Sequence, residues 1–321
     1  MLQATAKLRA TAKSRALGTQ RAMPRPGAGR SSRVTHRRSS GLAVMGAALA
    51  LALACSPHAE PTESPAAAPR LSAEETELMD TLDALSWVAD GADSQRHAYV
   101  ISAPWCGYCQ RLYRRSRGIE GVQLRWVKTD ARSPEHERQI AAATLTRDPA
   151  VLDAIYMGQG SLPEITDPEA GERLIAIHDA SVQAIVSFLE RRGGRLGYPT
   201  LIYAARDGVR VEPASEDPIA QLAAVAPRSD AVMGEPAAHH VATAELDEQP
   251  AAGVVVARAE GATVRAMPHR SGARILSLEP SQGVRAQSTL RVDGEQWYAV
   301  SVFRNGGVGY VLAAESDLRA P

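Results

Sequence analysis

Residues 102–110 read SAPWCGYCQ and contain Cys106 and Cys109, two of the three cysteines in the chain of 321 residues. Cysteines with this spacing can bind a metal ion, form a structural cross-link or carry out redox chemistry. A zinc site needs about four ligands, usually in two pairs, and the sequence has no second cysteine pair. A structural disulfide across so short a loop gains little from chain entropy. The sequence therefore predicts a redox pair and neither a metal site nor a cofactor.

The residues next to the pair supply the surroundings that redox chemistry needs. A strand is expected at 98–102, and a helix is expected to begin near Cys106 and to end at about residue 117. A thiol at a helix N-terminus meets free N–H groups and a partial positive charge, which favour the thiolate. Trp105 is expected to shield one side of Cys106. Cys109, one turn into the helix, is expected to be the resolving thiol.

Short signals along the chain predict further elements. Four capping residues stand directly before a proline, which fits the first helical position because it lacks an N–H group. These helix starts are Ser133-Pro134, Asp148-Pro149, Asp167-Pro168 and Asp217-Pro218. Other helices are expected at 71–89 and 181–192, and strands at 122–128, 201–205 and 209–212. Residues 71–226 therefore read as mixed helix and strand, with several helices inserted.

A tyrosine–proline pair lies about ninety residues after the cysteines, where Tyr198-Pro199-Thr200 precedes the expected strand 201–205. The WCGYC motif after a strand, together with this proline before a later strand, resembles the thioredoxin superfamily. A second hallmark of that superfamily is a cis-proline in the loop that faces the cysteines. The resemblance implies that the Tyr198–Pro199 bond is cis, although an ordinary trans turn proline is the alternative. A cis bond exposes the preceding backbone for antiparallel pairing with a substrate.

The mechanism that the resemblance implies is thiol–disulfide exchange with protein substrates. Cys106, as thiolate, attacks a substrate disulfide, and Cys109 resolves the mixed disulfide and leaves a Cys106–Cys109 disulfide. Run backwards, the same steps oxidise a substrate. Pro199 completes the expected catalytic set with the two cysteines. The expected substrate-binding residues are Trp105, Tyr198 and Thr200.

Within the superfamily, CGYC and the helix-rich span before Pro199 resemble the catalytic domain of the DsbC/DsbG disulfide isomerases, over residues 98–226. This resemblance favours a reductase or isomerase over an oxidase. Isomerases of that branch carry an N-terminal dimerisation domain, which residues 56–97 are too short to hold. They also typically have Thr where Tyr198 stands. The direction of the reaction therefore stays open.

The N-terminal residues have the pattern of an export signal. Ten basic residues and no acidic residue occur in 1–40, and an apolar stretch follows at 41–54. That stretch is too short to cross a bilayer comfortably, because about 20 residues are needed. The residues before Cys55 resemble a bacterial lipoprotein cleavage site, with ordinary signal cleavage as the alternative. The resemblance implies lipidation of Cys55 and a lipid anchor on the periplasmic side of the envelope, with the outer membrane slightly favoured.

The last seventy residues change to short, glycine-punctuated strands, expected at 253–257, 262–266, 284–287, 297–303 and 309–312. Together with Trp297-Tyr298 and Gly309-Tyr310-Val311, this pattern resembles a bacterial SH3-like domain. The resemblance implies a small all-β barrel that binds cell-wall peptide or a partner protein through an aromatic-lined groove. Packing inside the barrel is the alternative role of these aromatic residues.

The charge balance excludes one class of partner. Ten of the 36 basic residues lie in 1–40, so 26 basic residues face 36 acidic ones in the remainder. Nucleic-acid binding by the folded part is therefore not expected. The expected partners are protein disulfides or dithiols in the envelope and a membrane redox partner.

The sequence thus predicts an α/β thioredoxin-like domain with a helical insertion, followed by a small all-β SH3-like barrel. The expected parts are a signal sequence (1–54), a flexible tether (55–70), the redox domain (71–226), a linker (227–250) and the SH3-like domain (251–321). The predicted function is an exported thiol–disulfide oxidoreductase. The alternative is a non-catalytic envelope lipoprotein that binds cell wall or protein through its SH3-like domain.

Overall fold

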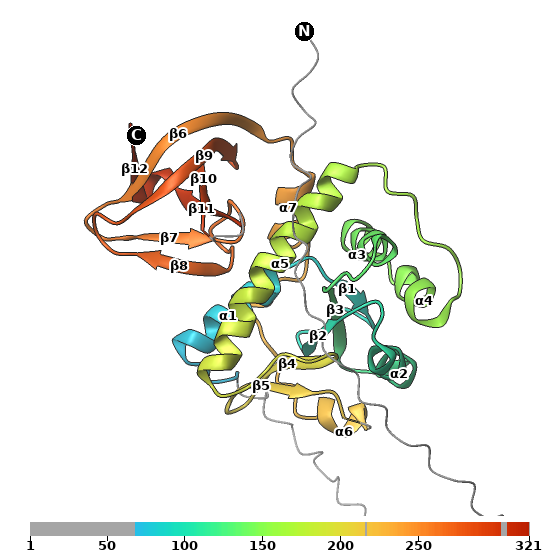
Figure 1. Ribbon diagram of the computed structural model, residues 1–321. Coiled ribbons are helices and arrows are strands. Elements are labelled where there is room, and N and C mark those ends of the chain that lie inside the picture. The colour runs from blue at the N-terminus through green and yellow to red at the C-terminus, as the bar shows by residue number, and fades with distance from the viewer. Residues whose placement is uncertain (1–67, 216, 303–306, 321) are drawn as a thin grey trace, which may run out of the picture. The chain divides into compact units, whose positions relative to one another are not determined.

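The computed structural model describes residues 68–215, 217–302 and 307–320 (Figure 1). The expected signal sequence, Cys55 and the tether up to residue 67 lie outside the described residues. The described residues form two β-sheets, one of five strands and one of seven. None of the helices in the described ranges is long and apolar enough to cross a membrane.

The first sheet has the strand order β1-β3-β2-β4-β5. Strands β2 and β3 are parallel, and every other neighbouring pair is antiparallel. These strands are β1 (Val88–Asp90), β2 (His97–Ser102), β3 (Gln123–Lys128), β4 (Thr200–Ala205) and β5 (Gly208–Pro213). The three central strands β2, β3 and β4 are buried along their whole length, so helices cover both faces of the sheet.

Alternating side chains of the central strands enter two separate cores, as the two-residue period of a strand requires. Val100 and Trp126 pack against the helices on one face, and Tyr99 and Ile101 pack against those on the other. The first face is covered by α2 (Gly107–Ser116), α3 (Pro134–Thr146), α4 (Ala150–Met157) and α6 (Pro218–Leu222). The second face is covered by α1 (Ala73–Ala84) and α5 (Pro168–Arg191).

The predicted helix starts agree closely with the structure. Ser133, Asp167 and Asp217 each accept a hydrogen bond from a backbone N–H in the first turn of α3, α5 and α6. Asp148 accepts from the N–H of Ala150 at 2.9 Å, although α4 has no side-chain cap at its N-cap position. The helix expected at 181–192 is only the second half of α5, which runs unbroken for 24 residues. No proline follows Pro168 within α5, so nothing in its sequence ends it earlier.

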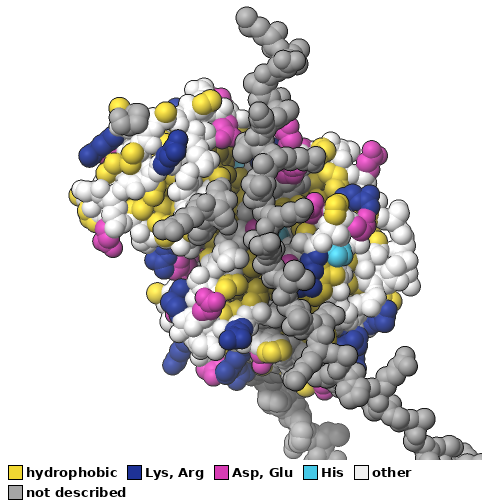
Figure 2. Space-filling model, in the orientation of Figure 1, with side chains coloured by type: hydrophobic (Ala, Val, Ile, Leu, Met, Phe, Trp, Pro, Cys, Tyr) yellow, Lys and Arg dark blue, Asp and Glu magenta, His cyan; other side chains and the backbone are white. Residues whose placement is uncertain are grey.

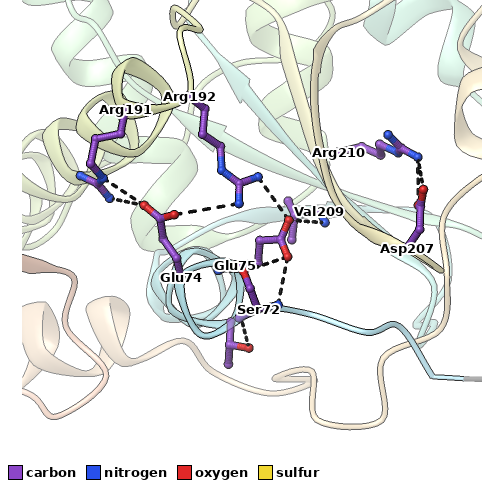
Figure 3. A network of polar contacts seen from close by, with 9 residues as sticks. Ser72, Glu74, Glu75, Arg191, Arg192, Asp207, Val209 and Arg210 are labelled. Atoms are coloured by element: carbon purple, nitrogen blue, oxygen red, sulfur yellow. Dashed lines mark hydrogen bonds and ion pairs between the residues drawn. The ribbon is translucent and has the colours of Figure 1, made fainter.

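The N-terminus of α1 is fixed by a polar network that Figure 3 shows. Ser72 and Glu75 form a capping box in which each side chain accepts from the other residue's backbone N–H. Glu75 also accepts from the N–H of Val209 in β5 and from Arg192, both at 3.2 Å. This one carboxylate therefore joins α1, the C-terminal end of α5 and the β4–β5 hairpin.

The stretch expected to be a linker, residues 227–250, is instead an integral part of the packing. Arg228 is 3% exposed and forms an ion pair of 2.8 Å with the buried Asp83 of α1. Arg125 of β3 reaches the same carboxylate at 3.1 Å. The helix α7 (Ala237–Thr243) follows and buries three of its side chains. The sequence could not reveal this, because the partner of Arg228 lies about 145 residues upstream.

The second sheet is antiparallel throughout, with the order β12-β6-β9-β10-β11-β7-β8. Its strands are β6 (Asp247–Ala257), β7 (Ala262–Arg265), β8 (Arg274–Leu278), β9 (Gly283–Val292), β10 (Glu295–Ser301), β11 (Val308–Leu312) and β12 (Ser316–Arg319). Each of the five expected strands corresponds to one of these, while β8 and β12 were not expected. The edge strands β12 and β8 do not pair among the described residues, so the sheet is open where a closed barrel was expected.

One hydrophobic core joins the second sheet to α5 and α7, which lie beside it (Figure 1). Trp297 of β10 is completely buried in this core, together with Leu174 of α5 and Val241 of α7. Trp297 therefore packs inside the protein and lines no open groove.

The space-filling view shows acidic and basic side chains interspersed over the described part of one face (Figure 2).

The shared core predicts that residues on its two sides stabilise the same folded unit. Trp297→Ala should lower the free energy of unfolding by about 3–5 kcal/mol and Leu174→Ala by about 2–5 kcal/mol, because each leaves a cavity. Urea unfolding measures both losses. The control is Leu318→Ala on the edge strand β12, whose side chain is 38% exposed, with an expected loss below about 1 kcal/mol. Losses at Trp297 and Leu174 no larger than that of the control would contradict the shared core.

Candidate functional site

Cys106 is the N-cap residue of α2, directly after the loop that leaves β2. Its sulfur accepts a hydrogen bond from the N–H of Cys109 at 3.1 Å. Its thiol donates to the carbonyl oxygen of Tyr198 at 3.4 Å. Cys106 is buried, with only 5% of the residue exposed to solvent. The sulfur is therefore held between the first turn of a helix and the loop before β4.

The Tyr198–Pro199 peptide bond is cis, as expected from the sequence. The ring of Tyr198 meets the indole of Trp105 edge to face, with 5.8 Å between the ring centroids. Trp105 is fixed in turn, because its indole N–H donates to the carbonyl of Asp130 at 2.8 Å. The structure thus brings Trp105, Cys106, Tyr198 and Pro199 together from positions more than ninety residues apart.

Thr200, the remaining residue of the expected substrate-binding set, has a different place. Its side chain is buried, and its hydroxyl donates to the carbonyl of Gly197 at 2.8 Å. Its backbone lies opposite Ile101 of β2 and Pro213 of β5. In this structure Thr200 closes the loop before β4, and its side chain does not face solvent.

Cys109 lies behind Cys106 and is completely buried. Burial raises the pKa of its thiol to about 12, and the hydrogen bond with Cys106 acts in the same direction. Both thiols are free, so the structure shows the dithiol form of the pair. In this form, Cys109 holds its proton throughout the neutral range.

A buried lysine beneath the pair was not found by reasoning from the sequence. Lys128, at the end of β3, is completely buried. Its side-chain nitrogen donates to the hydroxyl of Tyr156 at 2.7 Å and to that of Ser102 at 3.1 Å. Burial holds the pKa of Lys128 well below its usual range. The one available signal is compositional, since Lys128 is the sole lysine after residue 40.

The rim of the site is aromatic and basic. Tyr108, between the two cysteines, is 68% exposed, and the guanidinium of Arg111 lies 4.0 Å from the centre of its ring. Arg132 stacks in the same way on Trp105, at 3.2 Å from the ring centre. These side chains offer a surface that a polypeptide can contact next to the sulfur of Cys106.

Tyr198 also lines a groove of about 900 Å³. Thr129 and Asp130 line it where β3 ends, and Asp179 contributes from α5. Tyr310 of β11 also lines it. A polypeptide bound at Tyr198 would therefore have the second sheet beside it. No group of three or more His, Cys, Asp or Glu side chains in the described ranges is placed to hold a metal ion.

No protein-family model and no curated protein matches this sequence. One solved structure that matches part of the chain is the cell wall binding domain of the Staphylococcal phage 2638A endolysin. It is 15% identical, covers 23% of this chain and 85% of that domain, and superposes with a TM-score of 0.19. A likeness at this level carries no argument about fold or function.

The different positions of the two thiols predict selective alkylation of the dithiol form. At pH 7.5, iodoacetamide should label Cys109 at least tenfold more slowly than Cys106, because Cys109 is buried and its pKa of about 12 keeps it protonated. Mass spectrometry of the two labelled sites measures the rates. Unfolding in guanidinium chloride should bring the two rates together, whereas equal labelling of the folded protein would contradict this geometry.

Proposed function

We propose that the chain is a protein thiol–disulfide oxidoreductase whose redox pair is Cys106 and Cys109, in a thioredoxin-like domain over residues 71–226. The observation that carries the proposal is the position of the Cys106 sulfur, between the Cys109 N–H at 3.1 Å and the Tyr198 carbonyl at 3.4 Å. The helix N-terminus supports negative charge on this sulfur. The adjacent Tyr198 backbone offers a place for a substrate strand.

The exchange proceeds in two steps on this arrangement. The Cys106 thiolate attacks one sulfur of a substrate disulfide, and the other substrate sulfur leaves as a thiolate. Cys109 then loses its proton and attacks the Cys106 sulfur, which releases the second substrate thiolate. Two electrons pass to the substrate, and the protein is left with a Cys106–Cys109 disulfide. The burial of Cys109 supports its assignment as the resolving thiol, since a substrate reaches Cys106 first.

The direction and the location of the reaction rest on the sequence. The resemblance of CGYC to the disulfide isomerases supports a reductase or isomerase kept reduced by a membrane partner. The apolar stretch 41–54 and Cys55 support export and a lipid anchor on the periplasmic side of the envelope. We further propose that the second sheet, which resembles an SH3-like domain in sequence, positions the redox pair near cell-wall peptide or a client protein. Its core shared with α5 supports such a fixed placement.

Trapping of the mixed disulfide tests the proposed activity. In a Cys55→Ser background, which removes the third cysteine, Cys109→Ser should accumulate a covalent adduct between Cys106 and a peptide disulfide, because the resolving step is removed. Cys106→Ser should form no such adduct and should lose at least a hundredfold in disulfide reduction with dithiothreitol as donor. Non-reducing mass spectrometry identifies the adduct.

The protein with both cysteines replaced by serine is the matched control, and it should form no adduct. If Cys109→Ser traps nothing and the protein with both cysteines intact reduces no disulfide, the redox proposal fails. The non-catalytic binding protein then becomes the better account.

A further inference from the structure

Lys128 is a buried base candidate that the two-step exchange leaves without a role. Its side chain is completely buried, and its nitrogen lies 3.9 Å from the ring centre of Tyr156 and 4.7 Å from that of Trp126. Its two hydrogen-bond partners, Tyr156 and Ser102, are both neutral. Among the described residues, no carboxylate lies within ion-pair distance of this nitrogen.

A buried ammonium without a carboxylate partner is disfavoured, because burial penalises the charged form and its hydrogen bonds to two neutral hydroxyls do not balance that cost. The ammonium of Lys128 therefore releases its proton more readily than that of an exposed lysine, in agreement with the lowered pKa of Lys128. Negative charge on Cys109 or Cys106 acts in the opposite direction and favours the ammonium. The protonation of Lys128 and that of the cysteine pair are thus coupled by their electrostatic interaction.

Tyr156 connects the lysine to the resolving thiol. Its hydroxyl lies 2.7 Å from the Lys128 nitrogen, and Cys109 interacts with it electrostatically. It also lies 3.4 Å from the carbonyl of Ala103, in the loop that leads to Cys106. Tyr156 comes from α4, one of the helices inserted between β3 and β4. Tyr156 and Cys109 pack in the same buried core, so Tyr156 interacts with both the lysine and the resolving thiol.

We propose that Lys128 accepts the proton of Cys109, through the hydroxyl of Tyr156, when Cys109 resolves the mixed disulfide. This inference rests on the proposed function. As the proton moves to Lys128, the Cys109 thiolate forms a bond to the Cys106 sulfur, and the bond from Cys106 to the substrate breaks. The substrate leaves as a thiolate and takes a proton from water. When the pair is reduced again, Lys128 returns its proton to Cys109.

Three other titratable groups face Lys128. Asp90 on β1 and Cys106 at the N-cap of α2 interact with it electrostatically. His178 of α5 contacts its backbone carbonyl through Nδ1 at 3.2 Å, and the N–H of Ser86 donates to Nε2 of the same ring at 3.2 Å. His178 is therefore neutral, with its proton on Nδ1. Asp90 is the one competing base among these groups.

Single-turnover kinetics separate the lysine from the rest of the mechanism. The dithiol protein is mixed with excess peptide disulfide, quenched with acid, and analysed for the mixed disulfide and for the closed pair. In Lys128→Met and Tyr156→Phe, formation of the mixed disulfide should stay within twofold of the wild-type rate. Its resolution should slow at least tenfold at pH 7 and should rise in proportion to hydroxide between pH 6 and 8.5.

The matched control is Tyr203→Phe, which removes the hydroxyl of another buried tyrosine, one that donates to Glu212. Its two rates should equal those of the wild type. Circular dichroism establishes that each variant is folded, and Tyr156→Phe alone decides the matter if Lys128→Met does not fold.

Resolution within twofold of the wild-type rate in the folded variants would overturn the role of Lys128. Slow resolution in Asp90→Asn alone would likewise overturn it and assign the proton to the carboxylate. A wild-type protein that forms no mixed disulfide at all would instead contradict the proposed function, so the two failures are distinguishable.

Discussion

The contact between the Cys106 sulfur and the Tyr198 carbonyl depends on two strands that are neighbours in space and distant in sequence. Strands β2 and β4 pair antiparallel with Ile101 opposite Thr200. This register places the end of β2 next to the start of β4. The loop to Cys106 follows the end of β2, and Tyr198-Pro199 directly precedes the start of β4. The chain between them forms β3 on the other side of β2 and then passes through α3, α4 and α5 before it returns as β4.

The segment that makes this excursion also builds the floor of the site. Helices α3, α4 and α5 lie between β3 and β4 in sequence, and all three pack against the sheet or against one another. Helix α4 carries Tyr156 to a position under the cysteine pair, where it meets Lys128. Helix α5 supports the second sheet through Leu174. The inserted helices thus connect the redox pair with the C-terminal part of the chain.

Two buried polar clusters at opposite ends of β2 show how differently charge can be accommodated. Next to its first residue, His97, the carboxylate of Asp83 pairs with Arg125 and Arg228. Arg228 also pairs with Asp230, so two carboxylates balance two guanidinium groups. At its last residue, Ser102 contacts Lys128, which has no such partner among the described residues. A compensated cluster is suited to holding α1 and residues 227–236 on the sheet. An uncompensated base is suited to exchanging a proton.

Reasoning from the sequence predicted those features that depend on neighbouring residues. The capping signals before α3, α5 and α6 and the approximate bounds of the central strands are local, and they agree with the structure. Features that depend on distant partners were missed. Arg228 looked like part of a linker because Asp83 is far away in sequence, and a buried lysine cannot be told from an exposed one by its neighbours. The strands β8 and β12 are short and largely exposed on one or both faces, so they carry little hydrophobic pattern.

The reduction potential of the Cys106–Cys109 pair tests the central claim most directly. The purified protein would be equilibrated in glutathione buffers, and its free thiols would be counted by alkylation. A reductase or isomerase predicts reversible closure with a potential between about −180 and −270 mV. A value near −120 mV would contradict that direction and indicate a disulfide donor. A pair that never closes reversibly would contradict redox function altogether.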